Sequence, residues 1–94
     1  MTPITWDGAW RTEPVSGDLV RHGTVGHCRA VVRVMPPMFG TTWRGGCCYW
    51  RSELVLGPDP DSQVVRVGGL SGSVLNAKRG AAVGIAHLVE RFAY

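Results

Sequence analysis

The sequence contains few charged residues, and almost all of its basic residues are arginine. Charged residues make up 18% of the 94 residues, against 45% hydrophobic ones. Lys78 is the single lysine among ten basic residues, and the formal net charge is +3. Arginine favours planar, bidentate contacts with carboxylates, phosphates or base edges. The mild charge permits a nucleic-acid or an acidic protein partner and requires neither. The length and composition are those of one globular domain over residues 1–94.

The sequence also lacks the segments that mark secreted and membrane proteins. No apolar run approaches the roughly 18 residues that cross a bilayer. The first residues, MTPITWDGAW, contain neither the basic nor the apolar part of a signal peptide. The chain has three cysteines, an odd number. We therefore expect a cytoplasmic, reduced protein with no disulfide framework and no membrane partner.

No pattern of catalytic or metal-binding residues is present. The sequence contains no C-x-x-C and no regular spacing of its three histidines. Adjacent residues of a strand point to opposite faces, so Cys47 and Cys48 cannot share one site. Cys28 and Cys48 are expected inside as inert thiols, and Cys47 outside. Without a Walker loop or a nucleophile beside a base, we expect no enzymatic activity, no metal and no cofactor.

The sequence does contain strand-like alternation followed by a helical period. Asp7-Gly8 is a two-residue turn signal and predicts a hairpin within residues 1–17. Strands are expected within residues 18–35, 42–56 and 63–69. Residues 73–93 show an apolar stripe at helical spacing. The prediction is an α+β fold, in which an N-terminal hairpin and three antiparallel strands over residues 18–69 form a sheet with one C-terminal helix on one face.

Details of the helix indicate how it begins and how it packs. Ser73 or Asn76 is the expected N-cap. Gly80 and Gly84 each cost up to about 1 kcal/mol of helix propensity relative to alanine. Because they lie on one edge of the apolar stripe, we interpret them as positions where the helix packs closely against the sheet.

The face of the sheet away from the helix is the main candidate binding surface, because antiparallel sheets can leave one face in water. Arginine and tyrosine are prominent in binding hot spots, and they also suit phosphates and stacked bases. A shift of one residue in the register of a strand would turn its side chains on this face toward the core. The predicted binding residues are Arg29, Arg33, Tyr49, Arg51 and Arg66.

The sequence contains two smaller candidate sites. Met38, Phe39 and Trp43 lie in a predicted loop and either fold back onto the core or form a second contact patch. The stretch GGLSGS precedes the helix. With Lys78 and Arg79 it could hold an anion at the helix N-terminus, and the alternative is a plain connection from strand to helix.

The stretch SGSVLNAKRGAAVGIAHLVERF resembles the last helix of double-stranded RNA-binding domains. The likeness consists of an Ala-Lys pair and an Ala-rich turn after a Gly/Ser loop, and it covers about a quarter of the chain. Three antiparallel strands before the helix also suit that topology. Val74 and Leu75 stand where the family has basic residues, and the predicted hairpin stands where the family has its first helix.

These observations favour a small protein that binds a macromolecular partner and has no chemistry of its own. Its size and surface are typical of occluding inhibitors carried by phages and other mobile elements, for example of the anti-CRISPR type, with a protein or a protein–nucleic-acid complex as partner. One alternative is a nucleic-acid-binding module that uses the same basic and aromatic face. Another is a structural or assembly accessory protein, including a homodimer formed at an open sheet edge.

Overall fold

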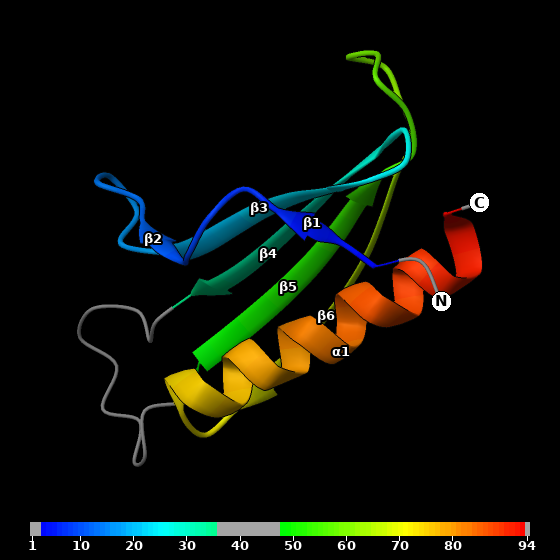
Figure 1. Ribbon diagram of the computed structural model, residues 1–94. Coiled ribbons are helices and arrows are strands. Elements are labelled where there is room, and N and C mark those ends of the chain that lie inside the picture. Colours follow the sequence, from blue (N-terminus) through cyan, green and yellow to red (C-terminus); the bar gives the residue numbers. More distant parts are fainter. Residues whose placement is uncertain (1–2, 36–47, 94) are drawn as a thin grey trace.

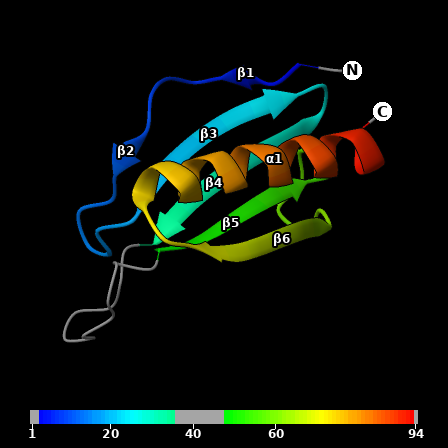
Figure 2. The same cartoon turned by 90° about the horizontal axis from the view of Figure 1, so that it is seen from below.

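The computed structural model describes residues 3–35 and 48–93, which form an antiparallel sheet with one helix packed on it (Figure 1). The sheet order is β1-β3-β4-β5-β6, and β2 also pairs with β3. Figure 2 shows α1 lying along one face of the sheet. The predicted α+β class, with its C-terminal helix, is confirmed. The elements are β1 (Thr5–Trp6), β2 (Arg11–Thr12), β3 (Leu19–Val25), β4 (Cys28–Met35), β5 (Cys48–Val55), β6 (Val64–Ser71) and α1 (Val74–Phe92).

The N-terminal segment pairs differently from the expected hairpin. Strands β1 and β2 both pair with β3 and not with each other, with Trp6 opposite Gly23 and Arg11 opposite Val20. The Arg21 Nε donates a 2.8 Å hydrogen bond to the carbonyl of Gly8 between the two strands. The Asp7-Gly8 turn therefore carries the chain along the edge of β3 instead of reversing it.

The long strand expected over residues 18–35 is in fact two strands. Gly26-His27 joins β3 to β4 in a tight hairpin, with Val25 opposite Cys28. Gly26 has a φ of 56°, and His27 is not in the positive-φ region. Glycine at the first central position is the signature of a type II′ turn, which suits the twist of paired strands. The alternation predicted after the turn is confirmed, since residues 28, 30, 32 and 34 are buried.

The helix lies close to the sheet because glycines surround Trp50. A Cβ atom at Gly80 would lie 2.6 Å from the Trp50 Nε1, and one at Gly84 would lie 2.8 Å from its Cζ3. On the neighbouring strand, a Cβ atom at Gly69 would lie 2.9 Å from the Trp50 Cζ2. The indole thus fills the space that three side chains would otherwise need. The close packing expected at Gly80 and Gly84 is confirmed.

Two hydroxyl groups fix the helix in place. Ser52 is fully buried, and its Oγ donates a 2.6 Å hydrogen bond to the carbonyl of Ala81. Burial of a hydroxyl is tolerated when it has such a partner. At the helix start, the Ser73 side chain accepts a 3.1 Å hydrogen bond from the backbone N–H of Asn76, so Ser73 is the N-cap.

We predict that Gly80→Ala destabilises the protein, although alanine is the better helix former by up to about 1 kcal/mol. The added methyl group would overlap the Trp50 indole, and overpacking of this kind costs about 1–3 kcal/mol. Urea unfolding of both proteins measures the difference. Gly72→Ala is the control, because a Cβ atom there meets nothing within 4 Å. A Gly80→Ala protein as stable as the wild type would contradict the close packing.

Candidate binding surface

The residues predicted to form the binding surface lie together on the sheet face away from α1. In the register of the strands, Arg33 is opposite Arg51 and Glu53 is opposite Arg66. Residues directly opposite in an antiparallel pair share a face, and their strand neighbours on the other face pack under α1. We call this surface the open face; it comprises Arg29, Val31, Arg33 and Met35 of β4, Tyr49, Arg51, Glu53 and Val55 of β5, and Val64, Arg66 and Leu70 of β6.

One cross-strand row of the open face is apolar. Met35 is opposite Tyr49, and Tyr49 is opposite Leu70, so the row crosses three strands. The exposed fraction is 44% for Tyr49 and 71% for Leu70. Tyr49 leans over β6, where a Cβ atom at Gly68 would lie 2.9 Å from its hydroxyl oxygen. The glycine therefore makes room for the aromatic ring, and we call Met35, Tyr49 and Leu70 the apolar row.

The next row brings two arginines together, and carboxylates offset their charge. Arg33 and Arg51 are directly opposite, an arrangement that is repulsive by itself. Arg33 forms ion pairs with Glu13 and, at 2.9 Å, with Asp18. The Arg51 Nε lies 2.8 Å from the Glu53 Oε1, an ion pair without hydrogen-bond alignment. Both arginines of this row are therefore locally neutralised.

The carboxylates that hold Arg33 come from the turn between β2 and β3. The backbone N–H of Glu13 donates to the carbonyl of Asp18 at 2.8 Å, and that of Gly17 donates to the carbonyl of Glu13 at 2.9 Å. Gly17 has a φ of 75°, a conformation that favours glycine. The hydrogen bond from Arg33 holds the pKa of the Glu13 carboxyl below its ordinary value. The ion pairs of Arg33 with Glu13 and Asp18 thus hold this turn against the open face.

The structure does not bring Lys78 and Arg79 together in an anion site. Residues 68–71 belong to β6, so most of the expected Gly/Ser loop is strand. The Lys78 Nζ lies 5.4 Å from the centre of the Trp10 ring, a cation–π contact. Arg79 lies instead beside Trp50, at a groove between α1 and β6. The patch predicted from Met38, Phe39 and Trp43, and the thiol of Cys47, lie outside the described residues.

The remaining cysteines are buried, as expected. Cys28 is 9% exposed and Cys48 is 2% exposed, and both face α1. Cys28 is the first residue of β4 and Cys48 is the first residue of β5. Because these two strands are antiparallel, the two cysteines lie at opposite ends of the sheet. Within residues 3–35 and 48–93, no three His, Cys, Asp or Glu side chains are grouped so that they could hold a metal ion. In the same part of the chain, no helix is long and apolar enough to cross a membrane.

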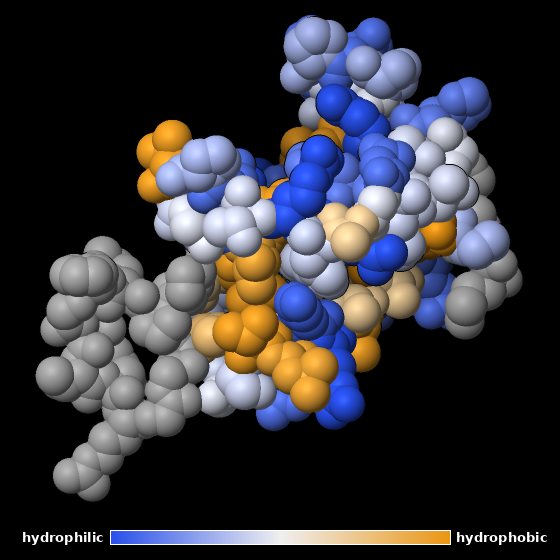
Figure 3. Space-filling view, turned by 60° about the vertical axis from the view of Figure 1, so that its left-hand side comes forward, coloured by the Kyte–Doolittle hydropathy of each residue, from blue (hydrophilic) through white to orange (hydrophobic). Residues whose placement is uncertain are grey.

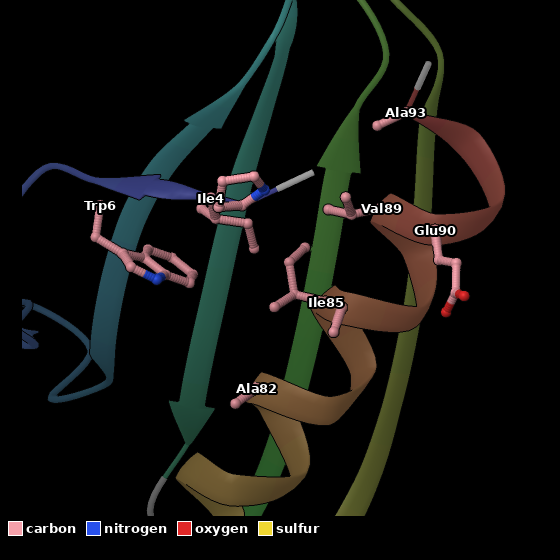
Figure 4. Close-up of a pocket in the computed structure, with 9 residues that line it drawn as sticks. Ile4, Trp6, Ala82, Ile85, Val89, Glu90 and Ala93 are labelled. Carbon is pink, nitrogen blue, oxygen red and sulfur yellow. The ribbon is translucent and has the colours of Figure 1, made fainter. Parts of the chain in front are cut away.

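An apolar hollow of about 460 Å³, which was not predicted from the sequence, lies between β1 and α1. Figure 4 shows Ile4 and Trp6 on one side of it and Ala82 and Val89 of α1 on the other. The signal for it lies in Gly23, where a Cβ atom would come within 2.8 Å of both Ile4 and Trp6. The glycine lets these side chains lie flat on β3 and leaves space next to the helix. The lining can accept a small apolar group and contains no catalytic pair.

Apolar side chains are also exposed on α1. Val74, Leu75 and Val83 have exposed fractions of 40%, 58% and 72%. On the side of the molecule seen in Figure 3, hydrophobic surface gathers in the lower half and hydrophilic surface lies mainly above it. The exterior is therefore a mixture of apolar and charged patches, and the open face is one of them.

No protein-family model, curated protein or solved structure matches this chain. The function therefore has to be argued from the chemistry of the surfaces described above.

We predict that Glu13→Gln changes how stability depends on pH. A carboxyl whose pKa is lowered on folding stabilises the fold above its unfolded pKa, near 4.5, and this contribution is lost as the pH falls through the lower folded value. The wild type should therefore exceed the variant in unfolding free energy near pH 7. The difference should shrink at acidic pH.

Urea unfolding at a series of pH values measures this difference. Arg33→Gln supplies the control, because the pH-dependent effect of Glu13→Gln should be much smaller in this background, where only the weaker contributions of Ser16 and His22 to the lowered pKa of Glu13 remain. A stability difference that is the same at all pH values would contradict the role of the Glu13–Arg33 pair.

Proposed function

We propose that this protein is a small, non-enzymatic binding module that docks through its open face on a protein partner. The observation that supports the proposal best is the apolar row of Met35, Tyr49 and Leu70, which is bordered by arginines. Interface hot spots are rich in tyrosine and arginine around an apolar centre, with polar groups at the rim. The open face has this composition across three rigid strands.

The charge of the open face favours a protein over a nucleic acid as the partner. Four arginines of β4, β5 and β6 lie on this face, and three carboxylates, Glu13, Asp18 and Glu53, lie among them. The local formal charge is therefore only +1. Nucleic-acid binding depends on unpaired cations that displace counterions from phosphates. Arg33 and Arg51 are already engaged with carboxylates, which makes them poor phosphate ligands.

A module of this kind acts by covering the surface of its partner. We extend the proposal to inhibition by occlusion, the mode expected of inhibitors of the anti-CRISPR type carried by mobile elements. Mimicry of DNA is not the proposed mode, because a mimic needs an acidic surface. The rigid backbone of three paired strands would keep the cost of ordering low on binding.

The proposal predicts that the double variant Arg29→Glu/Tyr49→Ala loses its partner. Immobilised wild type and variant would be incubated with lysate of the cell that carries the gene, with and without nuclease treatment, at about 50 and 200 mM salt. We expect one protein to be retained by the wild type at both salt concentrations. Retention by the variant should fall at least about tenfold, because the exposed tyrosine of the apolar row is lost and an arginine at the other end of the open face is reversed in charge.

Leu75→Ala/Arg79→Glu is the matched control, with the same two kinds of change on exposed α1 positions across the sheet. It should retain the partner like the wild type. Equal retention by the open-face variant would refute docking through this face. Recovery of nucleic acid alone, lost at the higher salt, would replace the proposal with a nucleic-acid-binding module.

A further inference from the structure

The two edges of the sheet are built differently. The outer edge of β3 is occupied by β1 and β2, and between them the backbone N–H of Asp7 donates to the carbonyl of His22 at 2.9 Å. At the other edge, β6 is the last strand, and no backbone segment of the described chain pairs with its outer side. Figure 2 shows β6 running along this side of the sheet.

Strand β6 lacks the usual protection of a free edge. Natural edge strands are short, bulged, or carry lysine or proline. Strand β6 has eight residues, pairs with β5 without interruption from Val64 to Ser71, and contains neither lysine nor proline. Its single charged residue is Arg66. Alternate residues of such a strand direct their backbone N–H and C=O groups outward, and a further strand is the partner whose chemistry satisfies these groups.

We propose that this further strand is β6 of a second copy, paired antiparallel about a twofold axis that passes between the two copies of Val67, perpendicular to the sheet. A twofold axis of this kind makes an isologous interface, in which the same surface is used on both subunits. The proposal goes beyond the proposed function and does not depend on it.

The register follows from the residues of β6. In this pairing, opposite residues share a face, and Val67 lies opposite itself. Val64 then lies opposite Leu70 of the partner subunit, and Arg66 opposite Gly68 of the partner subunit. The first contact joins apolar side chains that are 36% and 71% exposed in the single chain. The second places each arginine opposite a glycine that is covered by the partner's Tyr49, and it keeps the two arginines from facing each other directly.

The neighbouring register is less favourable. With Gly68 opposite itself, Arg66 would lie opposite Leu70 of the partner subunit, and Val64 would lose its apolar partner. The sequence of β6 is therefore self-complementary about Val67.

The helix side of the edge adds apolar surface to the same interface. A groove of about 470 Å³ runs between α1 and β6, and Trp50, Val67 and Val83 line it. A twofold axis perpendicular to the sheet leaves both helices on the same face. Three strand spacings separate the two β5 strands beneath them, so the helices lie about 14 Å apart. Direct helix packing takes about 8–10 Å, so the exposed Val83 side chains would fill part of the space between them.

The experiment is sedimentation equilibrium of the full chain over about 1–500 μM. We expect the wild type to dimerise. Val64→Glu and Leu70→Lys should each raise the dissociation constant about tenfold or more, because every dimer contains two Val64–Leu70 contacts and a charge replaces one side of both. The double variant Val64→Glu/Leu70→Lys places opposite charges across both contacts. It should return to within about threefold of the wild type.

Val15→Lys is the matched control, because this fully exposed apolar residue lies in the turn between β2 and β3. It should dimerise like the wild type, and circular dichroism confirms that each variant is folded. A wild type that stays monomeric throughout would overturn the proposal. So would single variants that dimerise normally, or a folded double variant that fails to recover, since either result excludes the register through Val67.

Discussion

The placement of α1 on the sheet depends on the indole of Trp50. A large aromatic side chain brings about 150–250 Å² of burial, but it can lie between two elements only if both withdraw their own side chains. Gly80 and Gly84 provide that space on the helix, and Gly69 provides it on β6. Ser52, two residues further along β5, then adds a directional contact to the helix backbone. One strand thus supplies both the bulk and the polar anchor that determine where the helix sits.

The N-terminal segment is held to the body of the protein from both faces of the sheet. On the helix side, Trp6 lies on Gly23 under the guanidinium of Arg21, 4.6 Å from the ring centre, and Trp10 meets Lys78 of α1. On the open face, Arg33 binds the two carboxylates that flank the β2–β3 turn. Short strands such as β1 and β2 have little stability of their own. Aromatic and ionic contacts therefore supply stability that the backbone hydrogen bonds of a longer strand would otherwise provide.

The sequence predicted the parts of the fold that follow from periodicity. Alternation identified the buried residues of β4 and β5, and the helical stripe identified α1, whose N-cap is Ser73, one of the two candidates. The division of residues 18–35 at Gly26-His27 was missed because valines continue the strand pattern on both sides of the turn. The pairing of β1 and β2 with β3 was missed because a local turn signal at Asp7-Gly8 does not reveal which distant strand each segment meets.

For the candidate surface, too, the features that depend on neighbouring residues were predictable, and those that depend on contacts between distant segments were not. Its five predicted residues were found by alternation, since all of them lie on strands. The neutralisation of Arg33 was not predictable, because Glu13 and Asp18 reach it only through a turn that folds over from another strand. The row of Met35, Tyr49 and Leu70 depends on the register of three strands, and a sequence contains no direct record of register.

The wrapping of β1 and β2 around β3 has a consequence for the solubility of the chain. A sheet with two open edges can add subunits at both, and such addition runs on into a fibre. Here the chain terminates its own sheet at one side with two strands of two residues each, too short to serve as a template for further growth. Edge-to-edge growth can therefore proceed at β6 only, and the addition of one second copy there would complete it.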